Sequence, residues 1–291
     1  MTAAVLLALS AAIFAALAIQ MQGKALAYLD DLSGTFVTVT TVALLSWVGA
    51  GWRIREEDWA SPAIPYFVAA GLLFPALGQR LQIASTRHVG PALTSAFGAF
   101  APFFAAMPAI VLLGETLSMQ QILGVFLLVG ALLLAAISRG VSWRGRAFYF
   151  LLLPLGAAMA RAMGMPIAKT GYLYLPDPFF ALIVIASTST LVVLAMLLMR
   201  GAPFPILQPG LGHVLFAANG LLVGAAILAI QLSLIAGPVS VTASLIATAP
   251  LWALVLGALV FKTEKLLWWH TVVAVIVSLG AVLIVTGAAP G

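Results

Sequence analysis

The chain has 291 residues, of which 64% are hydrophobic and only 7% are charged, with a formal net charge of +5. A soluble domain carries roughly 25% charged residues, so this composition excludes a water-soluble protein and predicts an integral membrane protein. The Lys and Arg residues are scattered among loops, a pattern that argues against a nucleic acid partner and is typical of contact with membrane lipids.

Apolar runs of helix length alternate with short polar joints along the whole chain. A spanning helix needs about 20 residues, whereas the strands of a membrane barrel would alternate in polarity over segments of about ten. The first run has no basic residues before it, so we expect a span and not a signal peptide. The predicted helices, ten in all, lie at residues 3–22, 34–52, 63–84, 90–112, 119–138, 147–169, 178–199, 211–234, 239–260 and 266–286.

The order of motifs in the first half recurs in the second half. The four matching pairs are Gly90 and Gly237, Pro102 and Pro250, Glu115 and Glu264, and Gly130 and Gly280. Their offsets grow from 147 to 150 residues, as one-residue insertions after a duplication would produce. The chain is therefore predicted to consist of two repeats of one structural unit.

A polar stretch, SRGVSWRGR, falls at the middle of the chain and separates five predicted helices from five. The sequence thus predicts a first repeat at residues 1–138, a linker at 139–146 and a second repeat at 147–291. Because five is an odd number, the second repeat must be inverted relative to the first. Fused inverted repeats place a substrate site near the bilayer midplane and support alternating access.

This arrangement resembles the EamA type of the drug/metabolite transporter superfamily. The resemblance rests on Pro102, the pair Gly114-Glu115, Gly124 and Gly130 in the first half, and on Pro250, Glu264 and Gly280 in the second. It implies an all-α, ten-helix carrier of the cell inner membrane that exports amino acids or related metabolites. The chain departs from the family pattern where KTEK replaces the usual Gly-Glu of the second half.

Arg161 is the side chain with the highest free-energy cost of insertion in the predicted membrane region. A charge at mid-helix costs at least ~2.5–3.5 kcal/mol on insertion scales and normally faces the bundle interior or water. One interpretation is that Arg161 binds a substrate carboxylate. The alternative is an arginine that extends to an interface or bonds the carbonyls of a helix end.

Amides and aromatic residues supply the other candidates for a cavity wall. The amides are Gln20, Gln22, Gln79, Gln82, Asn219 and Gln231. They suit a polar substrate, and interhelical hydrogen bonds explain them equally well. Phe100 and Trp252 are candidate aromatic walls, although such residues on a membrane helix more often face lipid.

Two prolines and two glutamates complete the candidate set. Pro102 and Pro250 are predicted to break a backbone hydrogen bond in the fourth helix of each half and so to act in gating, the alternative being a static kink. Glu115 and Glu264 are predicted to cap the helices that begin near residues 119 and 266, because a carboxylate complements a helix N-terminus.

These patterns favour a transporter over two other classes. An intramembrane lipid-modifying enzyme would need converging carboxylates, a metal-binding set or an activated nucleophile, and the sequence suggests none, nor a cofactor. A non-transporting receptor or scaffold explains the duplication less simply. We expect a small-molecule substrate, a monomer or homodimer, and facilitated export or exchange, because no Asp or Glu lies deep inside a predicted helix.

Overall fold

The computed structural model describes residues 2–90, 94, 97–138, 148–200, 210–259 and 268–287. All regular elements within these ranges are helical. The α-helices are α1 (Thr2–Ala25), α2 (Asp31–Ala50), α3 (Ile64–Gly71), α4 (Gly78–Val89), α6 (Ala101–Leu113), α7 (Met119–Ser138), α8 (Leu152–Tyr172), α9 (Pro178–Met199), α10 (Leu211–Ala236), α11 (Val239–Ile246), α12 (Ala249–Leu259) and α13 (Trp268–Gly287). The shorter helical segments are η1 (Gly51–Arg53), η2 (Glu56–Ala60), η3 (Leu72–Leu77), η4 (Gly98–Phe100) and η5 (Phe148–Leu151).

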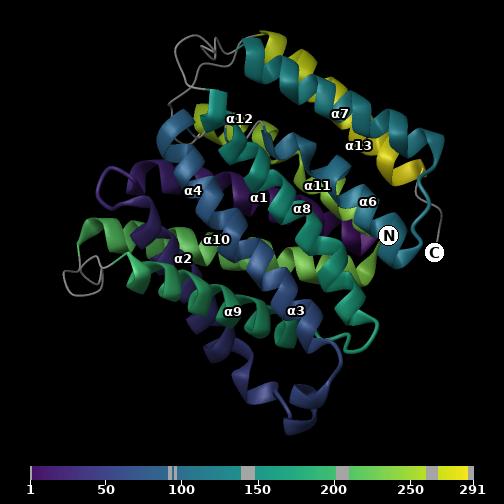
Figure 1. The fold of residues 1–291 in the computed structure, drawn as a ribbon. Coiled ribbons are helices and arrows are strands. Elements are labelled where there is room, and N and C mark those ends of the chain that lie inside the picture. Colours follow the sequence, from purple (N-terminus) through teal and green to yellow (C-terminus); the bar gives the residue numbers. More distant parts are fainter. Residues whose placement is uncertain are drawn as a thin grey trace.

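Length and composition make five of the described helical segments suitable for crossing a membrane. These are Thr2–Ala25, Asp31–Arg53, Ile64–Val89, Pro178–Met199 and Leu211–Ala236. Shorter apolar helices accompany them at Ala101–Leu113, Met119–Ala131, Val239–Ala253 and Val275–Gly287. The predicted all-helical, multi-pass membrane protein is therefore confirmed, and α8, which carries Arg161, lies in its interior (Figure 1).

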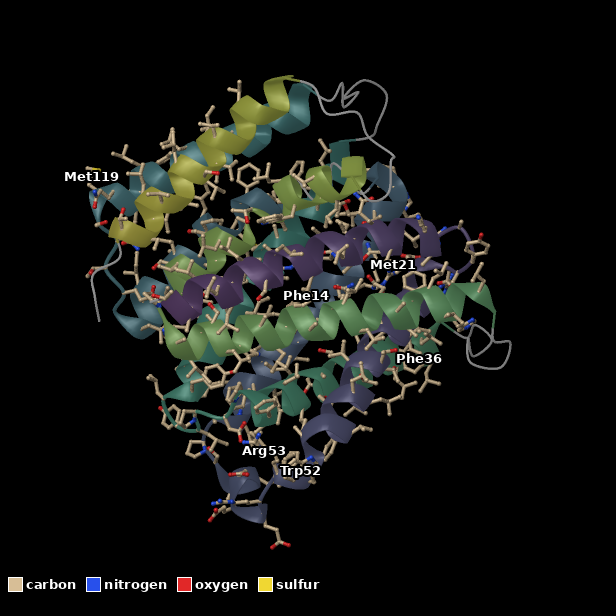
Figure 2. The ribbon with its side chains drawn as sticks, turned by 180° about the vertical axis from the view of Figure 1, so that it is seen from behind. Phe14, Met21, Phe36, Trp52, Arg53 and Met119 are labelled. Carbon is tan, nitrogen blue, oxygen red and sulfur yellow. The ribbon has the colours of Figure 1, made fainter. Side chains whose placement is uncertain are left out.

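Helices from the two halves of the chain pack against each other. α1 lies along α10, a pair that Figure 2 shows from behind, α2 lies against both α9 and α10, and α8 contacts α3, α4 and α6 (Figure 1). Aspartates begin two of these helices in the same way. Asp30 accepts hydrogen bonds from the backbone N–H groups of Leu32 and Ser33, and Asp177 does the same for Phe179 and Phe180.

The third predicted helix is continuous in sequence but interrupted in space. Pro75 lies inside it and supplies no backbone N–H, and the helix is interrupted in η3, between α3 and α4, where Phe74 has an extended backbone with φ −150° and ψ 125°. α4 then continues to Val89, five residues beyond the predicted end at residue 84. The interruption directs Phe74 towards α8, which matters for the site described below.

The predicted break at Pro102 and Pro250 is present in the fourth helical run of each half, and their role in gating stays a prediction. Each proline is the second residue of an α-helix, α6 or α12, and lacks the N–H that would bond the carbonyl four residues earlier. The break in each half lies just before the proline, at η4 and at residues 247–248. The position of each break fits a proline kink, because a proline leaves the carbonyl four residues before it without its helical partner.

Two glycines allow the last helices of the halves to touch. α7 and α13 lie side by side along one edge of the molecule (Figure 1). A Cβ atom added to Gly124 would lie 2.7 Å from the carbonyl oxygen of Gly280, and one added to Gly280 would lie 2.8 Å from that of Gly124. Small residues at such crossings let helix backbones approach closely in a membrane.

This contact makes a testable prediction about stability. Gly124→Ala places a methyl group against a backbone oxygen that cannot rotate away, so the two helices must separate. Overpacking of this kind costs about 1–3 kcal/mol, and we expect a lower thermal unfolding temperature in detergent. Gly130→Ala is the matched control on the same helix, because its added Cβ meets nothing within 4 Å. Equal unfolding temperatures for the two variants would contradict the proposed contact.

Candidate functional site

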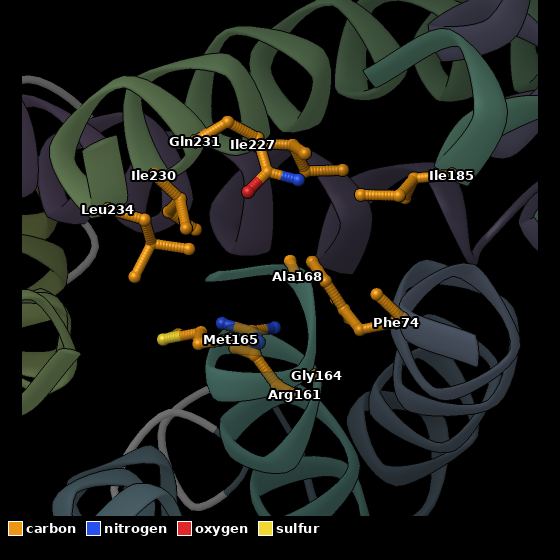
Figure 3. Close-up of a pocket in the computed structure, with 11 residues that line it drawn as sticks. Phe74, Arg161, Gly164, Met165, Ala168, Ile185, Ile227, Ile230, Gln231 and Leu234 are labelled. Carbon is orange, nitrogen blue, oxygen red and sulfur yellow. The ribbon is translucent and has the colours of Figure 1, made fainter. Parts of the chain in front are cut away.

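Arg161 lies near the middle of α8 and points into the space between the two halves (Figure 3). Its Nη2 donates a hydrogen bond to Oε1 of Gln82 on α4. Its guanidinium carbon lies 4.8 Å from the centre of the Phe74 ring, a cation–π contact. Among the residues that the structure describes, Arg161 has no carboxylate partner within ion-pair distance. A planar guanidinium carries five N–H donors, so most of them stay available to a ligand.

Two cavities meet at Arg161. We call the first the Gln231 cavity; it includes Gly164, Met165 and Ala168, which follow Arg161 along α8. We call the second the Pro250 cavity; it includes Pro154, Ala157 and Ala158, which precede Arg161. The guanidinium therefore lies between the two spaces.

The Gln231 cavity is apolar except at two opposite points. Arg161 rises from α8 on one side, and the amide of Gln231 on α10 points towards it from the other (Figure 3). Gln231 is only 3% exposed, and its Oε1 has no hydrogen-bond partner. Leaving a buried amide oxygen without a partner costs about 1–3 kcal/mol, a cost that a ligand donor would remove.

A chain of hydrogen bonds fixes the orientation of Gln82. Its Nε2 donates to Oε1 of Gln22 on α1 at 3.4 Å, which leaves Oε1 of Gln82 facing Arg161. Gln22 in turn donates to the hydroxyl of Thr86 at 2.7 Å. The chain connects α8, α4 and α1, so the position of the guanidinium is tied to helices of both halves.

The remaining predicted amides lie away from these cavities. Gln20 donates to the carbonyl of Ala253 at 3.3 Å, and Asn219 donates to the hydroxyl of Thr38 at 3.1 Å. Both bonds join helices of different halves. Gln79 is buried on α4, and neither its Oε1 nor its Nε2 has a partner. Arg161 and Gln82 are thus brought together, while Gln20, Gln79 and Asn219 are not among the residues lining either cavity.

Of the predicted aromatic and proline residues, some line a cavity and others pack elsewhere. Pro250 lines the second cavity. Phe100 packs against the cluster around Leu128 and Val241, and Trp252 packs against Ala16 and Ile19, with its indole N–H unpartnered. Pro102 is buried at the start of α6 and lines neither cavity.

Phe74 belongs to the site but is not among the residues that the sequence predicts for it. Phe74 gave no signal of its own, because a phenylalanine in an apolar run reads as core or lipid-facing. The neighbouring Pro75 was the available clue, since a proline inside a helical run indicates an interruption there. Gln231 was recognised only as one amide among several, and its place opposite Arg161 depends on how α10 packs.

Charged residues gather at the two ends of the bundle, beyond the cavities. At one end Arg200 bonds Asp30 at 2.7 Å, Arg80 bonds Asp31, and Arg87 donates to the carbonyl of Leu29 at 2.8 Å. Burial opposes ionisation of Asp30, but hydrogen bonds from Ser33 and Arg200 outweigh it and hold the pKa of this carboxyl below its usual 3.8. These pairs join α2 to α4 and to the end of α9.

Glu115 and Lys169 hold the opposite end, and here the predicted cap is wrong. The Glu115 carboxylate accepts from the backbone N–H groups of Val239 at 2.7 Å and Ser240 at 3.1 Å, so it caps α11 of the other half and not α7. Lys169 donates to the carbonyl of Gly237 just before α11. The start of α7 is held by its own Ser118 and Gln121, which exchange hydrogen bonds at 3.2 and 3.0 Å. Glu264 lies outside the described residues.

This arrangement can bind and orient a ligand. Arg161 can hold a carboxylate through two parallel hydrogen bonds, and Gln231 can bind a second polar group across the cavity. Metal chemistry has no visible donor set, since no group of three or more His, Asp or Glu side chains gathers within the described ranges. Binding without a chemical step is what a carrier requires.

Comparison with known proteins agrees with this interpretation. Residues 2–137 match the model described as the EamA-like transporter family. No curated protein matched the chain. A solved structure titled "Crystal structure of protein" has a TM-score of 0.78 with 14% sequence identity, covering 100% of this chain and 99% of that one, which shows a shared fold. Over residues 2–137, a little under half of its length, the chain is thus similar to the EamA-like transporter family, part of the drug/metabolite transporter superfamily.

Proposed function

We propose that this protein is an inner-membrane carrier that exports small metabolites such as amino acids. EamA family members are membrane transporters of the drug/metabolite superfamily, which gives the general class. The observation that carries the narrower proposal is Arg161: a guanidinium without a carboxylate partner among the described residues, between two cavities, suits a substrate carboxylate.

Alternating access by two inverted repeats is the mechanism we propose. Matching contacts in the two halves support it. Ser85 and Thr94 share a hydrogen bond of 2.7 Å, and Ser233 and Thr242, 148 residues further along in each case, share one of 2.8 Å. The two aspartate caps, Asp30 and Asp177, are a further matching pair.

Close helix contacts repeat in the same way. A Cβ on Gly71 would lie 2.7 Å from the carbonyl oxygen of Ile185, where α3 meets α9. A Cβ on Gly220 would lie 2.9 Å from the carbonyl oxygen of Thr38, where α10 meets α2. The third helical run of each half thus lies against the second helix of the other, as a two-fold axis between fused repeats requires.

In this mechanism the site at Arg161 is accessible first from one side of the membrane and then from the other. The polar contacts at the two ends would open alternately: those of Asp30, Asp31 and Arg87 at one end, and those of Glu115 and Lys169 at the other. No acidic side chain lines either cavity within the described residues. The proposal therefore includes facilitated export or exchange in place of proton coupling through a buried carboxylate.

The first test is efflux from liposomes loaded with aliphatic and aromatic amino acids and the matching 2-hydroxy acids. A hydrogen bond to a charged group is worth about 1.5–3 kcal/mol, so Arg161→Ala should slow efflux about 10- to 100-fold. Arg161→Lys keeps the charge but loses the planar fork and should fall between. Arg55→Ala removes a surface arginine and is the control. Efflux that survives Arg161→Ala would remove the residue from the substrate path.

The second test uses the absence of cysteine from the natural chain. Ala168→Cys reports on the Gln231 cavity and Ala157→Cys on the Pro250 cavity. Alternating access predicts that a transported substrate changes the rates of labelling by a membrane-impermeant maleimide in opposite directions at the two positions. Glu57→Cys, in an exposed loop, should label at a constant rate. Parallel changes at both cavity positions would contradict the rocking mechanism.

A further inference from the structure

The charges around the two cavities are unbalanced. Arg161 lines both of them, and no Asp or Glu appears among the described residues that line either one. Two other basic side chains have partners of their own: Lys169 donates to the carbonyl of Gly237, and Arg80 pairs with Asp31. A ligand in these cavities therefore meets one positive charge and no negative charge from the described residues.

The present partner of Arg161 is neutral. Gln82 accepts one hydrogen bond from the guanidinium, and Gln22 holds the Gln82 amide in that orientation. A hydrogen bond between two ionised groups is roughly twice as strong as one between neutral groups. A ligand carboxylate can therefore compete for the N–H donors on favourable terms, because it displaces at most a neutral amide and leaves no protein carboxylate without its partner.

The rest of the Gln231 cavity would not stabilise an ammonium group. The wall includes the aliphatic side chains of Ile185, Ile227, Ile230 and Leu234, and its aromatic ring, Phe74, already faces Arg161. The amide of Gln231 is the polar group opposite Arg161. An ionised amine without a counterion is expensive to place among apolar side chains. The partnerless Oε1 of Gln231 instead suits a neutral donor, such as a hydroxyl or an amide N–H.

We propose that the preferred substrate is a carboxylic acid of net charge −1 with a branched or aliphatic body and a neutral hydrogen-bond donor. Its carboxylate binds Arg161, its donor reaches Gln231, and its apolar body packs against the isoleucines and Leu234. A 2-hydroxy acid and an N-acylated amino acid both have this chemistry, and a free amino acid does not. The inference rests on the proposed transport function, but among small metabolites it favours acids of net charge −1 over the free amino acids named there.

The experiment compares three ligands that share the leucine skeleton. They are the 2-hydroxy acid in which a hydroxyl replaces the amine, with net charge −1, leucine itself, with net charge zero, and leucinamide, with net charge +1. Binding to the purified protein in detergent is measured by calorimetry, so the result does not depend on transport. We expect the hydroxy acid to bind at least about tenfold more tightly than leucine, a difference of about 1.4 kcal/mol, and leucinamide to show no binding.

Two variants separate recognition of charge from effects on folding. Arg161→Gln should abolish the preference for the hydroxy acid. Gln82→Glu leaves the shape of the site unchanged and gives the guanidinium a carboxylate partner, so this variant should lose binding of the anion while the protein stays folded. Gln20→Glu is the matched control, because Gln20 is on α1 and lines neither cavity. It should keep the preference of the natural protein.

The outcomes of binding and transport are distinguishable. Leucine binding that equals or exceeds hydroxy acid binding overturns the inference, as does a preference for the anion that survives in Gln82→Glu. Efflux of amino acids alone would also overturn it, while the transport function would stand. The expected order of binding without efflux of any ligand would overturn the transport function and support the assignment of the site.

Discussion

A single guanidinium inside an apolar helical bundle is the constraint on which the rest of this structure depends. Such a charge is costly at membrane depth, and here it is met by the amide of Gln82, by the ring of Phe74 and by the two cavities. Each partner places a demand on the fold. α4 must lie beside α8, and η3 must interrupt the third helical run where Phe74 turns towards Arg161.

The bundle meets these demands through small residues at its crossings. In a membrane no hydrophobic force drives helices together, so close backbone contact and hydrogen bonds between helices take its place. Gly71, Gly220 and the pair Gly124 and Gly280 allow backbones to approach to contact distance. Buried hydroxyl pairs such as Ser233 and Thr242 add polar contacts at equivalent places. The helices around Arg161 are thus held at close range, while the space between the halves stays open enough for cavities.

The same features that stabilise the bundle suit movement between its halves. The polar contacts at the two ends cross from one half to the other, because Arg200 reaches Asp30 and Glu115 reaches the start of α11. Contacts made by a few polar groups at the ends can break without unpacking the apolar interior. Arg161 and Gln82 also come from different halves, so a ligand that competes with Gln82 acts directly on the contact between them.

The sequence by itself determined the class of protein and the helices, because length and apolarity are local properties: α7 and α9 begin and end at the predicted residues 119–138 and 178–199. It also singled out Arg161, since a charge within an apolar run is conspicuous on its own. Only the tertiary structure decided which amide lies opposite that charge, that Glu115 caps α11, and that Phe74 covers the guanidinium. These facts depend on how distant helices pack, and the residues of one helix do not encode which face meets which partner.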